Sequence, residues 1–228
     1  EVAERLAWAR SVAARSIDDH RESWDQAIAR VQTSAHYAGL ELEPQVGLGP
    51  LGADPNSGLE EVLDLRTHDQ SAPLPQRVDG AWEVTEGMGV VFVLLPGGEH
   101  LMGSPESWPG SSVETEADEQ PRHRVDLAPF LISKFELTQA QWIRMAGSNP
   151  SRYQPGSAEL GGLQVSLVHP VDRVGTLQAR RMLARYAMAL PTEAQWEHAA
   201  AGGVEGPWFT GDTAASVEGY GNVRDAAS

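Results

Sequence analysis

The chain has 228 residues, of which 41% are hydrophobic and 21% charged, as is typical of a globular protein and not of a disordered or membrane protein. It carries 32 acidic and 17 basic residues, and the net charge of −15 argues against binding to nucleic acid, whose phosphates it would repel. No cysteine is present, which excludes disulfides, thiolate metal sites and cysteine nucleophiles from these residues.

The chain has no apolar run of the length that crosses a membrane. The longest, Val90 to Leu95, has the length of a buried strand, so we expect no membrane association. The first residues, Glu1 to Leu6, lack the basic and apolar regions of a signal peptide. This composition favours a cytoplasmic location.

Residues 1–37 are predicted to form a helical segment. Apolar residues recur at three- and four-residue steps from Val2 to Val31, the pattern of an amphipathic helix. Ser16, followed by Ile17 and two aspartates, would cap a second helix and divide the run. We expect the segment to pack against a partner domain. A coiled-coil seam is the alternative, and it would need a longer heptad repeat.

Residues 38–84 are predicted to be a connector with some local order. Only Leu59 to Leu65 has a short helical pattern. Prolines and glycines are frequent and forbid a long helix. They are Pro44, Pro50, Pro55, Pro73, Pro75, Gly47, Gly49, Gly52 and Gly58.

Residues 85–228 alternate short apolar strands with turns. Strands are predicted at Val90 to Leu95, which Pro96-Gly97-Gly98 ends, and at Phe130 to Lys134. Helices are predicted at Thr138 to Met145, Leu177 to Met188 and Thr192 to Ala201. Thr138 is the expected N-cap of the first, which buries Trp142. In the third, Thr192 and Gln195 have the spacing of a capping box and Gly202-Gly203 supplies the stop.

The order of several short motifs is more informative than any one of them. It resembles the formylglycine-generating enzyme family, also called the sulfatase-modifying-factor domain. The motifs are Leu95-Pro96-Gly97-Gly98, Leu101-Met102-Gly103-Ser104, Gln120-Pro121-Arg122-His123-Arg124-Val125, Phe130-Leu131-Ile132-Ser133-Lys134-Phe135-Glu136-Leu137-Thr138, Gln141-Trp142, His169-Pro170-Val171, Leu190-Pro191-Thr192-Glu193-Ala194-Gln195-Trp196-Glu197 and Pro207-Trp208.

The resemblance implies an α+β fold: an incomplete sulfatase-modifying-factor domain, like a C-type lectin, over residues 85–228, preceded by the amphipathic helical segment. Asn222 and Val223 match a corner that gives calcium an Asn side-chain oxygen and a backbone carbonyl, ligands that suit a hard cation. Active members bind copper(I) with a late pair of cysteines, which would fall after Ser228. We therefore expect copper only in a complete domain, and no catalytic residue in this chain.

The region from about Trp24 to Val62 resembles the segment that joins a serine/threonine kinase to this domain in some large bacterial proteins. Two functions follow. The chain is part of a formylglycine-generating-type oxidase and is inactive alone, or it is a non-catalytic, lectin-like module attached to a kinase that binds an unknown protein or peptide. The late cysteine pair in the full gene would distinguish them.

Other polar residues receive structural interpretations. His20, His36 and His68 are too scattered for the three-histidine iron cluster of related enzymes. His123 and His169 are expected to form structural hydrogen bonds, and His198 to pack. Glu193 and Glu197 share a helix face, where capping and a salt bridge explain them better than acid and base chemistry. Trp142, Trp196 and Trp208 are expected to be exposed to solvent, because an incomplete core leaves apolar faces uncovered.

Overall fold

The computed structural model describes residues 2–108, 115–157 and 164–220. They form two compact units, one containing Glu1–Pro96 and Phe130–Leu190 and the other Gly97–Pro129 and Pro191–Ser228. Both units combine helices with antiparallel strands, which confirms the expected mixture of α and β structure. Within the described ranges, no helix is both long and apolar enough to cross a lipid bilayer.

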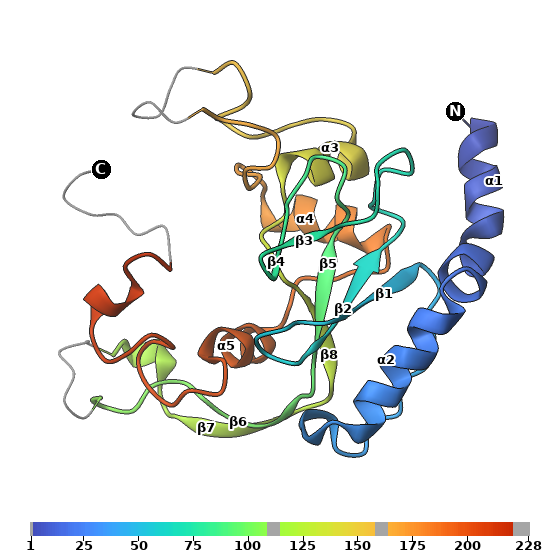
Figure 1. Cartoon of the computed structure of the whole chain (residues 1–228). Helices are drawn as coiled ribbons and strands as arrows, with labels where there is room; N and C mark the ends of the chain where they lie inside the picture. Colours follow the sequence, from blue (N-terminus) through green and yellow to red (C-terminus); the bar gives the residue numbers. More distant parts are fainter. Residues whose placement is uncertain (1, 109–114, 158–163, 221–228) are drawn as a thin grey trace. The chain divides into compact units, whose positions relative to one another are not determined.

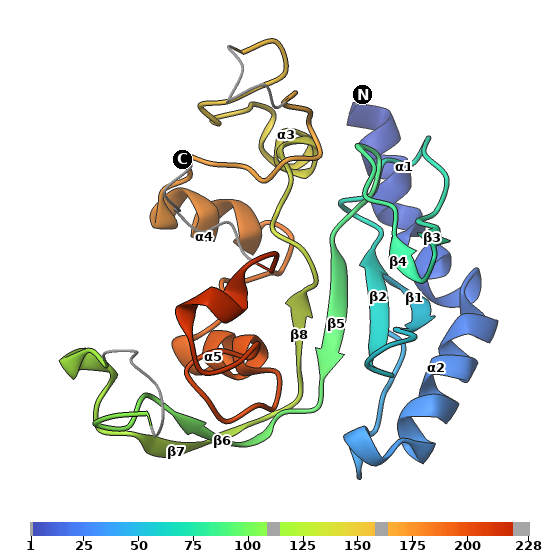
Figure 2. The same cartoon turned by 60° about the vertical axis from the view of Figure 1, so that its left-hand side comes forward.

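The first unit is built on a four-stranded antiparallel sheet in the order β1-β2-β5-β8 (Figure 2). The strands are β1 (Leu48–Ala53), β2 (Glu60–Asp64), β5 (Val91–Leu95) and β8 (Phe130–Ser133). The strands expected near Val90 and Phe130 are thus confirmed, and they pair with each other from Phe92↔Ser133 to Leu95↔Phe130. A two-residue hairpin strand pair, β3 (Arg77–Val78) and β4 (Ala81–Trp82), belongs to the same unit.

The helix predicted over Leu59 to Leu65 is wrong, because these residues contain β2, an inner strand of the sheet. All five residues of β2 are buried. The spacing of Leu59, Val62 and Leu63 imitates a helix face, but in the strand Val62 and Leu63 point to opposite faces. Val62 packs with Trp24, and Leu63 packs with Met88. Two buried faces remove the simple alternation that identifies a strand in sequence.

The prolines and glycines of the expected connector fit an edge strand. β1 lies at the end of the sheet and includes Pro50, whose missing N–H is tolerated there. The pairing register with β2 shifts between Pro50 and Gly52, and Gly52 has a φ of 90°. This bulge uses the conformational freedom of glycine. The expected connector therefore contributes two ordered strands, β1 and β2, to the sheet.

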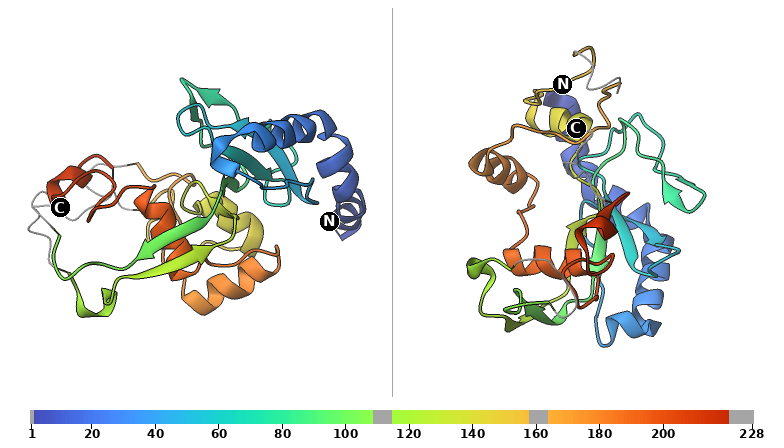
Figure 3. Two further views of the ribbon diagram at one scale, coloured as in Figure 1. Left: turned by 90° about the horizontal axis from the view of Figure 1, so that it is seen from below. Right: turned by 90° about the vertical axis from the view of Figure 1, so that its left-hand side faces the viewer.

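The N-terminal helices are α1 (Val2–Ala13) and α2 (Arg21–Thr33), joined by a π-helical turn at Ala14–Asp18. The predicted division near Ser16 is confirmed, and Figure 3 shows α1 turning away from the line of α2 there. Ser16 is not an N-cap as predicted. Its buried hydroxyl donates to the Val12 carbonyl at 2.5 Å, inside the turn. Such back-bonding by serine often accompanies a bend.

Helix α2 lies along β1 and supplies the core on one side of the sheet (Figure 1). Trp24 is 1% exposed, packs with Leu48 and Val62, and donates its indole N–H to the Ser16 carbonyl at 2.8 Å. Val31 and Tyr37 continue this contact towards Leu94 of β5. The helical segment is thus anchored by a tryptophan, as its amphipathic pattern indicates.

Two further helices complete the first unit. α3 (Gln139–Ala146) begins at Thr138 with a capping box to Gln141, ends at Gly147 and buries Trp142, as expected. α4 (Thr176–Ala184) is shorter than predicted and ends four residues before Met188. Ala187 has a φ of 53°, a conformation that cannot continue a right-handed helix. Trp142, Met145 and Met182 form the cluster that joins α3 and α4.

The second unit pairs β6 (Gly98–Met102) with β7 (His123–Leu127) and packs α5 (Glu193–Ala201) on them. Two short 3-10 turns, at Ala117–Glu119 and Ala214–Val217, belong to it. The capping box of Thr192 and Gln195 and the left-handed Gly202 stop are confirmed. Trp196 is 62% exposed and Trp208 38% exposed, whereas Trp142 is buried. Of the three tryptophans expected to be exposed, only the two in the second unit are exposed.

Truncation of Trp24 tests the anchoring of α2. We expect Trp24→Ala to lower the free energy of unfolding by about 3–5 kcal/mol, the usual cost of removing a buried tryptophan side chain. Leu177→Ala is the control, since Leu177 is 63% exposed in the same unit. Urea denaturation followed by circular dichroism measures both, and equal losses in the two variants would contradict the packing described.

Candidate functional site

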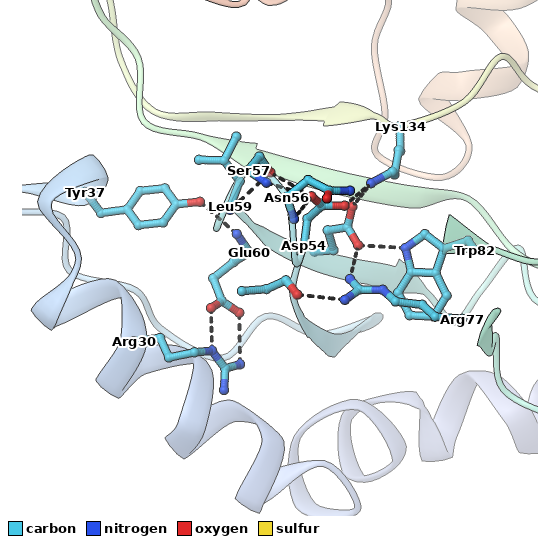
Figure 4. A network of polar contacts seen from close by, with 12 residues as sticks. Arg30, Tyr37, Asp54, Asn56, Ser57, Leu59, Glu60, Arg77, Trp82 and Lys134 are labelled. Atoms are coloured by element: carbon cyan, nitrogen blue, oxygen red, sulfur yellow. Dashed lines mark hydrogen bonds and ion pairs between the residues drawn. The ribbon is translucent and has the colours of Figure 1, made fainter. Parts of the chain in front are cut away.

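The predicted calcium ligands, Asn222 and Val223, lie outside the described residues. The calcium site therefore stays a prediction. The polar residues that the structure does gather belong to the first unit (Figure 4). They lie on α2, on the 3-10 turn that follows it (Ala35–Tyr37), on β2, on the β3–β4 pair, and directly after β1 and β8.

The carboxylate of Glu61 is the centre of this network. Glu61 is fully buried in β2 and accepts hydrogen bonds from Lys134 Nζ at 2.5 Å, Arg77 Nη2 at 2.5 Å and Trp82 Nε1 at 2.6 Å. The Arg77 guanidinium also lies 4.3 Å from the centre of the Trp82 ring, a cation–π contact. Both carboxylate oxygens are therefore occupied by donors from three other segments.

Asp54 links the turn after β1 to the same lysine. Its Oδ1 accepts the backbone N–H groups of Asn56 and Ser57, both at 2.9 Å, and its Oδ2 accepts Lys134 Nζ at 2.7 Å. Burial would raise the pKa of Asp54, but these hydrogen bonds outweigh it and hold the pKa well below its usual range. Burial would likewise lower the pKa of Lys134, which its bonds to Asp54 and Glu61 raise instead.

Glu60 and Tyr37 connect α2 with the sheet. The guanidinium of Arg30 donates two hydrogen bonds to the Glu60 carboxylate, Nε to Oε1 at 2.6 Å and Nη2 to Oε2 at 3.0 Å. The Tyr37 hydroxyl donates to the Leu94 carbonyl at 2.7 Å and accepts the Glu60 backbone N–H at 2.9 Å. Burial raises the pKa of Tyr37 to about 12. One phenol thus joins the 3-10 turn after α2 to β2 and β5.

This arrangement is structural and offers no group for chemistry. Three carboxylates, Asp54, Glu60 and Glu61, face three cations, Arg30, Arg77 and Lys134. The raised pKa of Lys134 keeps its amine protonated and unsuited to nucleophilic attack. In the part of the chain that the structure describes, no three His, Asp or Glu side chains are grouped to hold a metal ion.

A second polar set ties α3 to the loops before β5. Arg144 donates to the carbonyls of Thr67 at 2.9 Å, Met88 at 2.7 Å and Glu86. The Gln141 amide donates to the Gly89 carbonyl at 2.9 Å. Burial lowers the pKa of Arg144, and the negative charges of Asp69 and Glu86 offset this effect only in part. Donors of α3 thus satisfy loop carbonyls that lack a strand partner.

Histidines of both units have the structural contacts expected of them. His123 Nδ1 lies 2.9 Å from the Pro121 carbonyl, and His169 Nδ1 lies 3.0 Å from the Ser166 backbone nitrogen. His198 packs edge-on against the ring of His100 at 5.2 Å. Burial lowers the pKa of His198, and the nearby His100 adds to this effect.

Glu197 does not pair with Glu193 across a helix turn. Its Oε1 accepts the Gly103 backbone N–H at 2.8 Å and lies 3.2 Å from His100 Nε2, so it fastens α5 to the end of β6. Sequence reasoning missed His100, Glu61, Lys134 and Arg77. The available signal was the group of acidic residues, Glu60, Glu61 and Asp64, that alternates with the apolar residues of 59–65.

The copper site implied by the family resemblance does not fit this chain. Copper(I) is a soft ion that the family binds with a pair of cysteine thiolates, and these 228 residues contain no cysteine.

Removal of the Lys134 amine should destabilise the first unit strongly. We expect Lys134→Met to cost about 3–5 kcal/mol, because it leaves buried carboxylates without their shared cation. Arg21→Met is the control, since its ion pair with Asp18 is exposed and should be worth less than about 1 kcal/mol. Chemical denaturation measures both, and a Lys134→Met loss as small as that of the control would refute the role of the network.

Tyr37 predicts a loss of stability in alkali. Because its pKa is raised from 10 in the unfolded chain to about 12, the folded state holds a proton that the unfolded state releases, and stability falls as the pH rises from about 10 to about 12. The loss should be about 2–3 kcal/mol. In Tyr37→Phe this part of the pH dependence should vanish, and an unchanged slope in denaturation at alkaline pH would contradict the assignment.

Comparison with known proteins supports the family resemblance. Residues 83–226 match the family model of the sulfatase-modifying factor enzyme 1-like domain. One relative, the serine/threonine-protein kinase pkn1 of Chlamydia pneumoniae, is 34% identical over 128 residues, which cover 50% of this chain and 19% of the kinase. The chain thus spans about a fifth of that relative's length. Its match to the family model extends over more than half of its residues, and the chain belongs to the sulfatase-modifying factor enzyme 1-like family.

Proposed function

We propose that this chain is a non-catalytic binding module of a larger protein that also contains a serine/threonine kinase. The observation that carries the proposal is the internal pairing of the buried carboxylates in the described part of the first unit. Glu61, Asp54 and Glu60 all have cationic partners within the fold, so the largest polar network stabilises structure and leaves no acid, base or nucleophile free.

The joint between the matched domain and the preceding segment supports this role. Tyr37, Asp54 and Glu61 precede residue 83, yet they bond Leu94 and Lys134 inside the matched range. A segment held by such contacts is not a loose linker. It would hold the module in a fixed orientation relative to a kinase domain joined to its N-terminal side. Such a fixed orientation would let the binding of a ligand to the module affect the kinase.

The competing function is oxidation of a substrate cysteine to formylglycine in a longer polypeptide. Family membership favours it, and the chemistry would need a cysteine pair that these 228 residues do not contain. Sequencing of the native gene discriminates between the two functions. A cysteine pair within the same domain would favour the oxidase, and its absence would leave the binding module.

An activity assay tests the non-catalytic proposal directly. We expect the purified protein, supplied with copper(I) and oxygen, to leave a Cys-X-Pro-X-Arg peptide unchanged in mass spectrometry, because no thiolate ligand is available to the metal. Stoichiometric conversion to formylglycine would overturn the proposal.

The kinase association has a separate test. The native protein, immunoprecipitated from its own cells, should transfer phosphate from ATP to a generic protein substrate. A native polypeptide that fails to phosphorylate itself or the substrate would count against a kinase in the same chain, whatever the outcome of the formylglycine assay.

A further inference from the structure

Two loops of the first unit meet at the imidazole ring of His68. One comprises residues 65–72, after β2, and the other comprises residues 85–90, before β5. His68 is 7% exposed, and its Nδ1 accepts the backbone N–H of Gly89 at 3.2 Å. Its Nε2 lies 3.4 Å from the Ala72 carbonyl oxygen. The ring therefore has a donor next to Nδ1 and an acceptor next to Nε2.

These partners fit the neutral ring and not the protonated one. A ring nitrogen that accepts a hydrogen bond carries no hydrogen, so the hydrogen of neutral His68 is on Nε2, on the side of the Ala72 carbonyl. In the protonated ring both nitrogens are donors, and Nδ1–H would face the N–H of Gly89. Protonation thus breaks this hydrogen bond and leaves two buried donors opposed to each other.

The two loops pack too closely for the ring to move easily. A Cβ added to Gly89 would lie 2.7 Å from the Asp64 carbonyl oxygen and 2.8 Å from the His68 backbone nitrogen. The backbone N–H of Asp64 donates to the Val90 carbonyl at 2.8 Å, and the Val90 N–H donates to Thr67 Oγ1 at 2.9 Å. A charged ring would therefore have to separate the loops in order to find new partners.

The charged groups that act on His68 come from its own loop and from α3. Burial lowers the pKa of His68, and the Arg144 guanidinium adds to this effect. The Ala72 carbonyl and the Asp69 carboxylate act in the opposite direction without cancelling it. Other charged side chains in or beside the two loops have partners of their own. They are Asp64 and Arg66, which pair with each other, Glu86, which acts on Arg144, and Arg15, which donates to Gln70.

The two loops belong to different parts of the chain. His68 and Thr67 precede residue 83, whereas Gly89 and Arg144 lie inside the matched range and bond to them. We propose that His68 is an acid-sensitive latch, whose neutral ring ties the preceding segment to the matched domain and whose protonation releases Gly89 and opens the two loops. The inference concerns this joint and stands whether or not the domain has a catalytic role.

The latch acts in mildly acidic solution. An unfolded histidine has a pKa of about 6.5, and the pKa of His68 is lower than this while the loops are closed. The open state therefore binds the proton more strongly than the closed state does. The closed state loses stability as the pH falls below about 6.5, and it keeps its full stability above that pH.

Hydrogen exchange of the full chain, followed by NMR, tests the inference. The readout is the protection factor of the Gly89 and Val90 amides, which corrects for the effect of pH on exchange in an unstructured peptide. Relative to His68→Asn, the protection of the parent should fall about five- to tenfold between about pH 7.5 and about pH 5.5. One pH unit below the pKa of the open state is worth about tenfold.

Two variants and one titration assign the effect to this ring. In His68→Asn the side-chain oxygen can accept the Gly89 N–H and does not titrate. His123→Asn is the control and should lose protection as the parent does, because His123 is exposed on β7 of the second unit. In the parent, the NMR titration of the His68 C2–H should have its midpoint below about 6.5.

A midpoint at or above about 6.5 would overturn the inference, and so would equal losses of Gly89 protection in the parent and in His68→Asn. If His68→Asn does not fold, the parent alone decides. A low midpoint together with protection that falls below about pH 6.5 supports the latch, and protection that stays constant over this range refutes it.

Discussion

The burial of the Glu61 carboxylate is the constraint on which the first unit depends. A lone ion in this position would be costly, since its hydration is lost, and the fold stabilises it with Lys134, Arg77 and Trp82. Lys134 directly follows β8, and Arg77 and Trp82 lie on β3 and β4. Satisfying one carboxylate thus fixes the positions of several segments relative to the inner strand β2.

The same contacts explain why the family domain and the segment before it fold together. The matched range begins at residue 83, but its strand β5 pairs with β2 on one side and β8 on the other. Without β2, the backbone of β5 would be left as an open edge. The boundary seen by sequence similarity therefore lies inside a sheet, and the folded unit is larger than the recognised domain.

The second unit depends on local signals. The capping box at Thr192 starts α5, and Glu197 fastens that helix to the backbone after β6. Trp196 of the same helix stays exposed.

The sequence by itself determined the family, the N-terminal helices, the strands near Val90 and Phe130, and both capping boxes, because these depend on residues close together in the chain. It failed at β2, since Leu59, Val62 and Leu63 fit a helix as well as a strand buried on both faces. Only the tertiary structure decided that Lys134 reaches Asp54 and Glu61, 80 and 73 residues away. The partners of a buried charge depend on how distant segments pack together, and a local sequence pattern contains no information about that packing.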